Sequence, residues 1–180
     1  MFGALSGLVA GLVGSGVMEG FQALWLKAKE RLGADETGGS AAPGPPVKLA
    51  ALAVEGGASP PDPAPVKVAA AVTASLTGGR LRKAEKEPAG RIVHYAFGTA
   101  SAIGYGVLAD LAPIVTLGFG TLFGIAVWIL LDNLMLWALG LAKRPTAYPL
   151  SAHAYALASH VVYGAAVEAV RQLVRPLFPS

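Results

Sequence analysis

The chain has 180 residues, of which 54% are apolar and 14% are charged, and it contains no cysteine. A soluble domain usually carries about 25% charged residues, so the composition argues against an ordinary soluble domain. The lack of cysteine excludes disulfides, thiolate metal sites and cysteine nucleophiles. The net charge of +3 hides an uneven distribution, because ten of the fourteen basic residues and seven of the eleven acidic residues lie within residues 27–91.

Four long apolar runs account for most of the remaining sequence. They cover residues 2–26, 92–113, 114–142 and 150–170. A helix needs about 20 residues to cross the hydrocarbon core of a bilayer, so each run predicts a transmembrane helix. The expected fold class is therefore all-α, a bundle of four transmembrane helices. As one helix the third run would reach about 44 Å, and it would have to tilt or emerge from the membrane.

The connector at residues 27–91 is rich in proline, glycine and alanine. Such a sequence buries too little apolar surface to offset the entropy of ordering, which predicts a long, mostly disordered loop. One part of it differs. Pro65 is suited to open a helix and Gly78 to end one, so residues 65–77 predict a short helix lying on the membrane surface.

Basic residues indicate the orientation, because they are retained on the cytoplasmic side. The connector 27–91 and the pair Lys143 and Arg144 are predicted to be cytoplasmic, which places both termini on the outer side. Arg171 and Arg175, after the fourth run, argue for the opposite orientation but are fewer.

Small residues recur at intervals of four in every apolar run. Such stripes allow helix backbones to approach closely in a membrane, where packing replaces the hydrophobic drive. The predicted packing positions are Gly7, Gly11, Gly98, Gly106, Gly120, Gly124 and Gly164. We expect these faces to join helices within one subunit or between the subunits of a homo-oligomer.

Four acidic residues lie inside the apolar runs. Asp110 and Glu168 are near run ends, where water or Arg171, one turn after Glu168, offers a partner. Glu19 and Asp132 are each at least two turns from the nearest basic residue in sequence. A carboxylate facing lipid is costly, so both are expected to point into the bundle, protonated or hydrogen-bonded. Their candidate partners are Gln22, Asn133 and His160.

These polar residues support two hypotheses. In the first the chain is a structural or stress-related helical bundle, in which polar side chains hold the helices together. In the second it is a small transporter or channel, in which Glu19, Asp132 and His160 carry protons or coordinate a cation. The secondary polar positions are His94, Tyr105, Asp110, Asn133, Tyr163 and Glu168.

Other function classes find little support. Two histidines among His94, His153 and His160 could ligate haem from facing helices, but His94 and His153 lie near the surface and no spaced pair repeats in the other leaflet, so no cofactor or metal is expected. The GxSxG, P-loop and HExxH motifs are missing, so the chain is not expected to be an enzyme. Acidic residues are interspersed through the connector, which contains no aromatic residue, so the expected partner is the lipid bilayer and not a nucleic acid.

Four segments resemble the YagU-like family of small bacterial inner-membrane proteins. They are GLVAGLVGSGVMEGFQ, RIVHYAFGTASAIGYGVLAD, GFGTLFGIAVWILLDN and ASHVVYGAAVEAVRQ. Their most specific parts are His94, Phe97, Gly98, Tyr105 and Gly106 in the second run, and His160, Tyr163, Gly164 and Glu168 in the fourth. The family often has an acidic residue after the third-run aspartate, where this chain has Asn133. The resemblance implies a multi-pass protein of the bacterial inner membrane and supplies no substrate.

Overall fold

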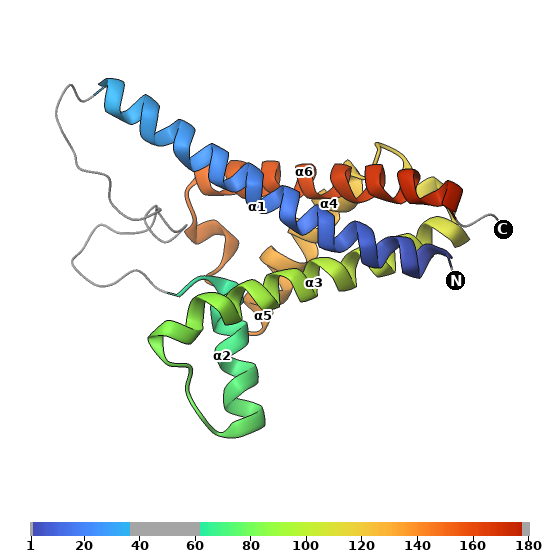
Figure 1. Cartoon of the computed structure of the whole chain (residues 1–180). Coiled ribbons are helices and arrows are strands. Elements are labelled where there is room, and N and C mark those ends of the chain that lie inside the picture. The colour runs from blue at the N-terminus through green and yellow to red at the C-terminus, as the bar shows by residue number, and fades with distance from the viewer. Residues whose placement is uncertain (1, 37–61, 178–180) are drawn as a thin grey trace.

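A computed structural model describes residues 2–36 and 62–177, and all regular structure in that part of the chain is helical. The predicted all-α class is therefore confirmed (Figure 1). The α-helices are α1 Phe2–Glu36, α2 Ala64–Thr77, α3 Lys83–Leu111, α4 Thr121–Val127, α5 Leu136–Ala138 and α6 Leu150–Val174. A π-helical segment, Trp128–Met135, joins α4 to α5, and short 3-10 segments cover Pro113–Thr116, Pro145–Ala147 and Arg175–Leu177.

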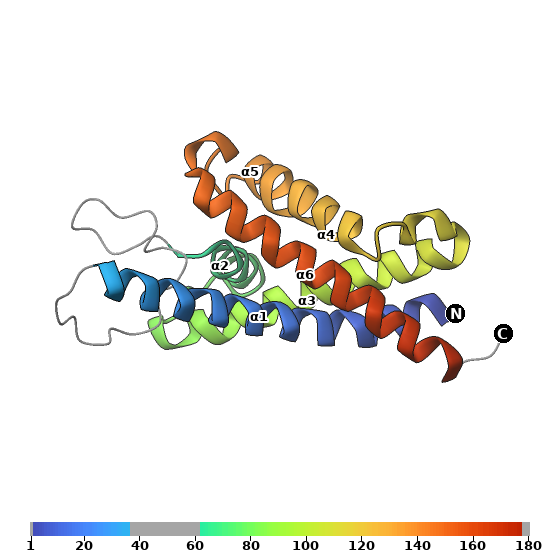
Figure 2. The ribbon, with the colours of Figure 1, turned by 90° about the horizontal axis from the view of Figure 1, so that it is seen from above.

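Among the long helices, α1 packs against both α3 and α6, and α4 packs along α6 (Figures 1 and 2). The chain runs up and down this bundle: α3 returns antiparallel to α1, the α4–α5 segment reverses again, and α6 follows the direction of α3. The start of α1 and the end of α6 therefore lie at the same end of the bundle.

The third apolar run differs from its prediction as one helix over residues 114–142. A 3-10 turn begins at Pro113, and three successive residues, Gly118, Phe119 and Gly120, have φ values of 75°, 53° and 75°. Left-handed backbone ends a right-handed helical path, so α4 begins only at Thr121. The helical part that remains, residues 121–138, is short enough to cross a bilayer without excess length.

The connector is shorter than predicted, because helix extends into residues 27–91 from both sides. α1 continues to Glu36 through a segment that contains two each of alanine, lysine and glutamate, which are good helix formers. α3 begins at Lys83, where the backbone N–H of Arg82 donates to Glu85 Oε2 at 2.8 Å. The part predicted to be disordered falls mainly on residues 37–61, which lie outside the described residues.

Helix α2 covers the range in which a short surface helix was predicted, and it ends at Gly78 with φ of 67°. It runs across the direction of α1, α3 and α6, and Figure 2 views it end-on. Two contacts attach its start to α3. Val66 packs where a Cβ on Gly90 would lie, and Lys86 Nζ contacts Asp62 Oδ2 at 2.6 Å.

Within residues 2–36 and 62–177, three helices are long and apolar enough to cross a membrane: Phe2–Arg31, Lys83–Leu111 and Thr121–Ala138. Large apolar side chains cover their outer surfaces. Leu111 and Leu122, for example, are 77% and 57% exposed. A continuous apolar surface of this kind favours contact with lipid. α6 has the required length, but two histidines, Glu168 and Arg171 lower its apolar character.

Candidate functional site

The predicted packing glycines of α1 and α3 lie against each other. A Cβ added to Gly106 would overlap the carbonyl oxygen of Gly3, and one added to Gly7 would overlap that of Ala102. Gly11 lies against Thr99 Cα, and the Cβ position of Gly98 is filled by the Ser15 hydroxyl. The two backbones therefore touch along most of their shared length, as small-residue stripes allow.

A second glycine contact joins the α4 region to α6. Gly120 and Gly164 face each other so closely that a Cβ on either would overlap the carbonyl oxygen of the other. Gly124 has the same relationship to the His160 carbonyl oxygen. All seven predicted glycines are thus used within one chain. A homo-oligomer stays a prediction, and it would have to use other faces of the helices.

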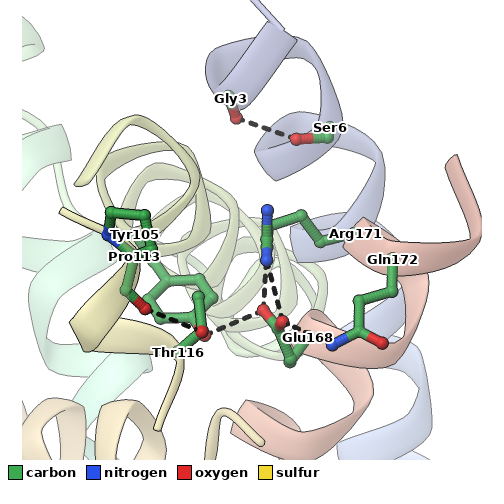
Figure 3. A network of polar contacts seen from close by, with 8 residues as sticks. All are labelled: Gly3, Ser6, Tyr105, Pro113, Thr116, Glu168, Arg171 and Gln172. Atoms are coloured by element: carbon green, nitrogen blue, oxygen red, sulfur yellow. Dashed lines mark hydrogen bonds and ion pairs between the residues drawn. The ribbon is translucent and has the colours of Figure 1, made fainter. Parts of the chain in front are cut away.

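Glu168 of α6 is the centre of a buried polar network (Figure 3). Its side chain is fully buried. Arg171 donates from Nε to Oε2 and from Nη2 to Oε1, both at 2.8 Å. Gln172 Nε2 donates to Oε1 and the Tyr105 hydroxyl of α3 donates to Oε2, each at 2.8 Å. Four hydrogen bonds saturate the carboxylate, so this group is suited to hold α3 and α6 together.

Asp110, at the other end of α3 from its basic start, binds the beginning of α1. Its Oδ2 accepts the backbone N–H of Gly3 at 2.6 Å. The first N–H groups of a helix have no partner inside the helix, and they attract negative charge. Asp110 therefore supplies from a neighbouring helix the cap that the α1 sequence lacks.

Glu19 does not meet the partners expected from the sequence, which were Gln22, Asn133 and His160. Its Oε1 contacts Arg91 Nε at 3.2 Å, and its Oε2 accepts the Tyr95 hydroxyl at 3.1 Å. Both partners are on α3. The side chains of Glu19 and Arg91 are 35% and 66% exposed, so the ion pair lies at the edge of the bundle.

Asp132 and His160 are brought together from the π-helical segment and α6. Asp132 Oδ2 lies 3.4 Å from His160 Nε2, within ion-pair distance and at the long end of hydrogen bonding. The His160 side chain is 9% exposed and that of Asp132 is 44% exposed. π-helical turns are rare and frequent at functional sites. Here the wide turn carries Asp132, and Asn133 Nδ2 donates to the Trp128 carbonyl across it at 2.9 Å.

The hydrogen bonding of His160 determines which ring nitrogen faces Asp132. Its Nδ1 lies 2.8 Å from the Ala156 carbonyl oxygen. A carbonyl only accepts, so Nδ1 carries hydrogen and Nε2 is the nitrogen that faces the carboxylate. The two facing atoms, Nε2 and Asp132 Oδ2, are therefore the positions at which this pair can bind a proton.

The pair borders a cavity of about 90 Å³. The cavity is lined mainly by apolar side chains of α1, α2, α3, α6 and the Val127–Leu136 stretch. Its polar lining comes from Ser15, His94, Ser101, Asp132, His160 and Tyr163. Two of these have a buried atom without a hydrogen-bond partner, Ser15 Oγ and His94 Nε2. Both atoms are enclosed by the chain, so the polar groups that the cavity offers to a guest are chiefly Asp132 and His160.

Two further polar side chains, Tyr163 and His153, pair with backbone carbonyl groups outside their own helical turn. The Tyr163 hydroxyl donates to the Gly98 carbonyl oxygen on α3. His153 Nε2 lies 2.9 Å from the Pro145 carbonyl oxygen, at the start of α6 and apart from the cavity. Among the described residues no three histidine, aspartate or glutamate side chains lie close enough to hold a metal ion.

Sequence reasoning missed Arg91 and Ser15 as site residues. Arg91 was assigned to the connector, because its charge ends the basic segment. The signal that could have found it is helical spacing, since Arg91 and Tyr95 are one turn apart and present to Glu19 one charged and one hydroxyl group. Ser15 was noted only as a small residue of the stripe.

Comparison with known proteins gives one family. Neither the curated proteins nor the solved structures contain a match to this chain. A family model described as protein of unknown function (DUF1440) matches residues 80–169, from the start of α3 to Glu168 and its neighbour in α6. The match covers half of the chain and includes Asp132, His160 and the Glu168 carboxylate, while Glu19 lies outside it. The chain belongs to the DUF1440 family.

Proposed function

We propose that the chain is a four-span protein of the bacterial inner membrane, of the YagU-like type, in which α6 is the fourth span. α6 has 25 residues, about 37 Å of helix. It packs against α1 and α4, and its charged end is neutralised within the Glu168 network. The start of α1 and the end of α6 lie at the same end of the bundle, which supports an even number of crossings. The distribution of basic residues supports a cytoplasmic connector 27–91 and periplasmic termini.

Reporter fusions test this topology. Alkaline phosphatase, which is active only in the periplasm, is fused in turn after residue 45, after Ala142 and after the last residue. Four spans with the proposed orientation give activity only for the last fusion. Activity of the fusion after Ala142 together with inactivity of the last fusion would show that the orientation is the opposite one. Equal activity of these two fusions would exclude α6 as a span.

The function that the geometry supports best is that of a structural bundle. The observation that carries it is the saturated Glu168, a fully buried carboxylate with four hydrogen bonds from two helices. Asp110 and Glu19 likewise bind groups of a neighbouring helix. Three of the four intramembrane acids are therefore interhelical ties. Such ties fix the register of helices that the apolar environment alone does not specify.

Thermal unfolding of the purified protein in detergent tests the structural role. Glu168→Gln leaves Arg171 buried without its anion, so the unfolding temperature should fall well below that of wild type. Glu19→Gln, at the exposed edge, is the control and should change it little. An unfolding temperature unchanged by Glu168→Gln would contradict the structural role of this residue.

A second candidate function is proton or cation conduction, and one observation favours it. Asp132 is the one intramembrane acid of the described chain that borders the cavity, and it lies within ion-pair distance of His160. Protein in liposomes loaded with a pH-sensitive dye tests this candidate. Conduction through the pair predicts a dye response to a pH step that Asp132→Asn abolishes and Glu19→Gln leaves intact. An equal response from wild type and Asp132→Asn would exclude the pair as the carrier.

A further inference from the structure

We infer that the cavity between α1, α2, α3, α6 and the π-helical segment is a water-filled vestibule, open only toward the end of the bundle that carries α2. The inference rests on the proposed membrane-spanning arrangement, and it supplies the second candidate function with its ligand, water that delivers protons to Asp132 and His160. The vestibule does not require that protons cross the protein.

The lining residues place the cavity in one half of the bundle. Ser15 and Met18 belong to the middle of α1, and Val93–Ser101 is the central part of α3, about two turns beyond its basic start. The third span contributes residues near its end, within Leu131–Leu136, and α6 contributes His160 from its first half. Because successive helices alternate in direction, these positions meet on the α2 side of the bundle. Pro65 and Val68 of α2 form part of its lining there.

The carboxylate of Asp132 requires polar surroundings that the chain supplies only in part. Its side chain lines the cavity and is 44% exposed, with His160 as its ion-pair partner. A carboxylate in contact with lipid is costly, and lipid cannot hydrogen-bond to it, whereas water can. The volume of about 90 Å³ holds several water molecules, since one needs roughly 15 Å³ of such volume. Water in the cavity would therefore solvate Asp132.

The charges around the cavity favour water that exchanges protons. The titratable groups that face it or lie next to it are Glu19 on α1, His94 on α3, Asp132 on the π-helical segment and His160 on α6. Glu19 is held by Arg91 and Tyr95. Asp132 Oδ2 and His160 Nε2 lie 3.4 Å apart, and a hydronium ion arriving through the vestibule can give a proton to either atom and leave as water.

A dry layer closes the vestibule on its far side. Phe123 stacks on Tyr105 with ring centroids 4.3 Å apart and contacts Tyr163 at 5.8 Å. Ala102 and Val167, both fully buried, complete the layer. Beyond it lies Glu168, whose hydrogen bonds are already saturated. Water that enters from the α2 side therefore ends at this aromatic layer.

Thiol labelling tests the vestibule, because the wild-type chain has no cysteine and an introduced one is the only reactive thiol. Two matched pairs are available in full-length protein. Ser101→Cys and Met135→Cys line the cavity, while Ala100→Cys and Leu134→Cys are their exposed neighbours outside it. The probe is a membrane-impermeant trimethylammonium methanethiosulfonate, applied separately to each side of oriented membrane vesicles. Two positions on different helices guard against the failure of one variant to fold.

The two cavity cysteines should react at least about tenfold faster than their neighbours, because the thiolate that reacts forms only in contact with water. They should do so only from the side that carries α2. Equal rates within each pair, or reaction from both sides, would overturn the inference. The same vesicles, loaded with a pH-sensitive dye, separate the two proposals. Reactive cysteines without proton flux support the vestibule and exclude conduction, whereas flux with unreactive cysteines excludes the vestibule alone.

Discussion

Tyr105 on α3 donates its hydroxyl hydrogen to Oε2 of Glu168 on α6 at 2.8 Å, and both side chains are almost fully buried. The bond joins two helices that are 63 residues apart at these positions. It also connects the two parts of the core, since the Tyr105 ring stacks on Phe123 of α4. A single side chain thus links a carboxylate network to the aromatic layer that closes the cavity.

The first prediction concerns that hydroxyl. Tyr105→Phe keeps the ring and its stacking but removes one of the four donors of Glu168. Hydrogen bonds to charged groups contribute about 1.5–3 kcal/mol, so the free energy of unfolding should fall by roughly that amount. Chemical unfolding in mixed micelles measures it. Tyr163→Phe is the control, because that hydroxyl donates to a neutral carbonyl and its loss should cost about 1 kcal/mol. A larger loss in Tyr163→Phe would contradict the importance of the Glu168 network.

The second prediction concerns the partner charge. Arg171→Met removes the cation that makes two of the four bonds to Glu168 and leaves a buried carboxylate without its counter-ion. Breaking a buried pair from one side costs about 3–5 kcal/mol. Adding Glu168→Gln to this variant removes the stranded charge. The double variant should therefore unfold at a higher temperature than Arg171→Met alone. Additive losses in a double-mutant cycle would show that the two side chains do not interact.

The third prediction concerns the contact between α1 and α3. Gly106→Ala places a Cβ on the Gly3 carbonyl oxygen, so the two helices must separate, and the unfolding temperature should fall. Gly104→Ala, two residues earlier on the same helix, is the matched control because its Cβ meets no atom within 4 Å. Alanine is the better helix former, so this variant should be as stable as wild type or slightly more so. Equal losses in both variants would mean that close packing at Gly106 is unimportant.

The sequence predicted some features of the helix arrangement and not others. The lengths of the apolar runs predicted the long helices, and the spacing of small residues predicted the glycine faces, because both features depend only on nearby sequence. Counting residues along each helix from its end predicted that Asp132 and His160 lie in the same part of the bundle, where they are 3.4 Å apart. The same counting did not find the partner of Glu19, because a distance along one helix does not reveal a basic side chain on the neighbouring helix. Arg91 reaches Glu19 because α3 begins eight residues earlier, at Lys83.

Local backbone geometry explains the other differences. Residues 114–142 read as continuous apolar sequence, and hydropathy does not register that Gly118, Phe119 and Gly120 take left-handed conformations. The cavity also could not be predicted, because its lining comes from five segments whose contacts depend on which glycines meet. α2 was predictable, since Pro65 and Gly78 mark its ends in the sequence.

The last prediction concerns Phe123, whose ring separates the vestibule from the Glu168 network. Phe123→Ala removes the ring between Tyr105 and Tyr163 and leaves a space that water can enter from either side. Replacing a core phenylalanine with alanine costs about 3–5 kcal/mol, so the protein should be less stable but fold. In the Ser101→Cys background the thiol should then react from both sides of the membrane. Phe119→Ala is the control, because that ring is 48% exposed at the turn before α4 and is not part of the layer. Continued reaction from the α2 side alone in Phe123→Ala would show that Phe123 is not the barrier.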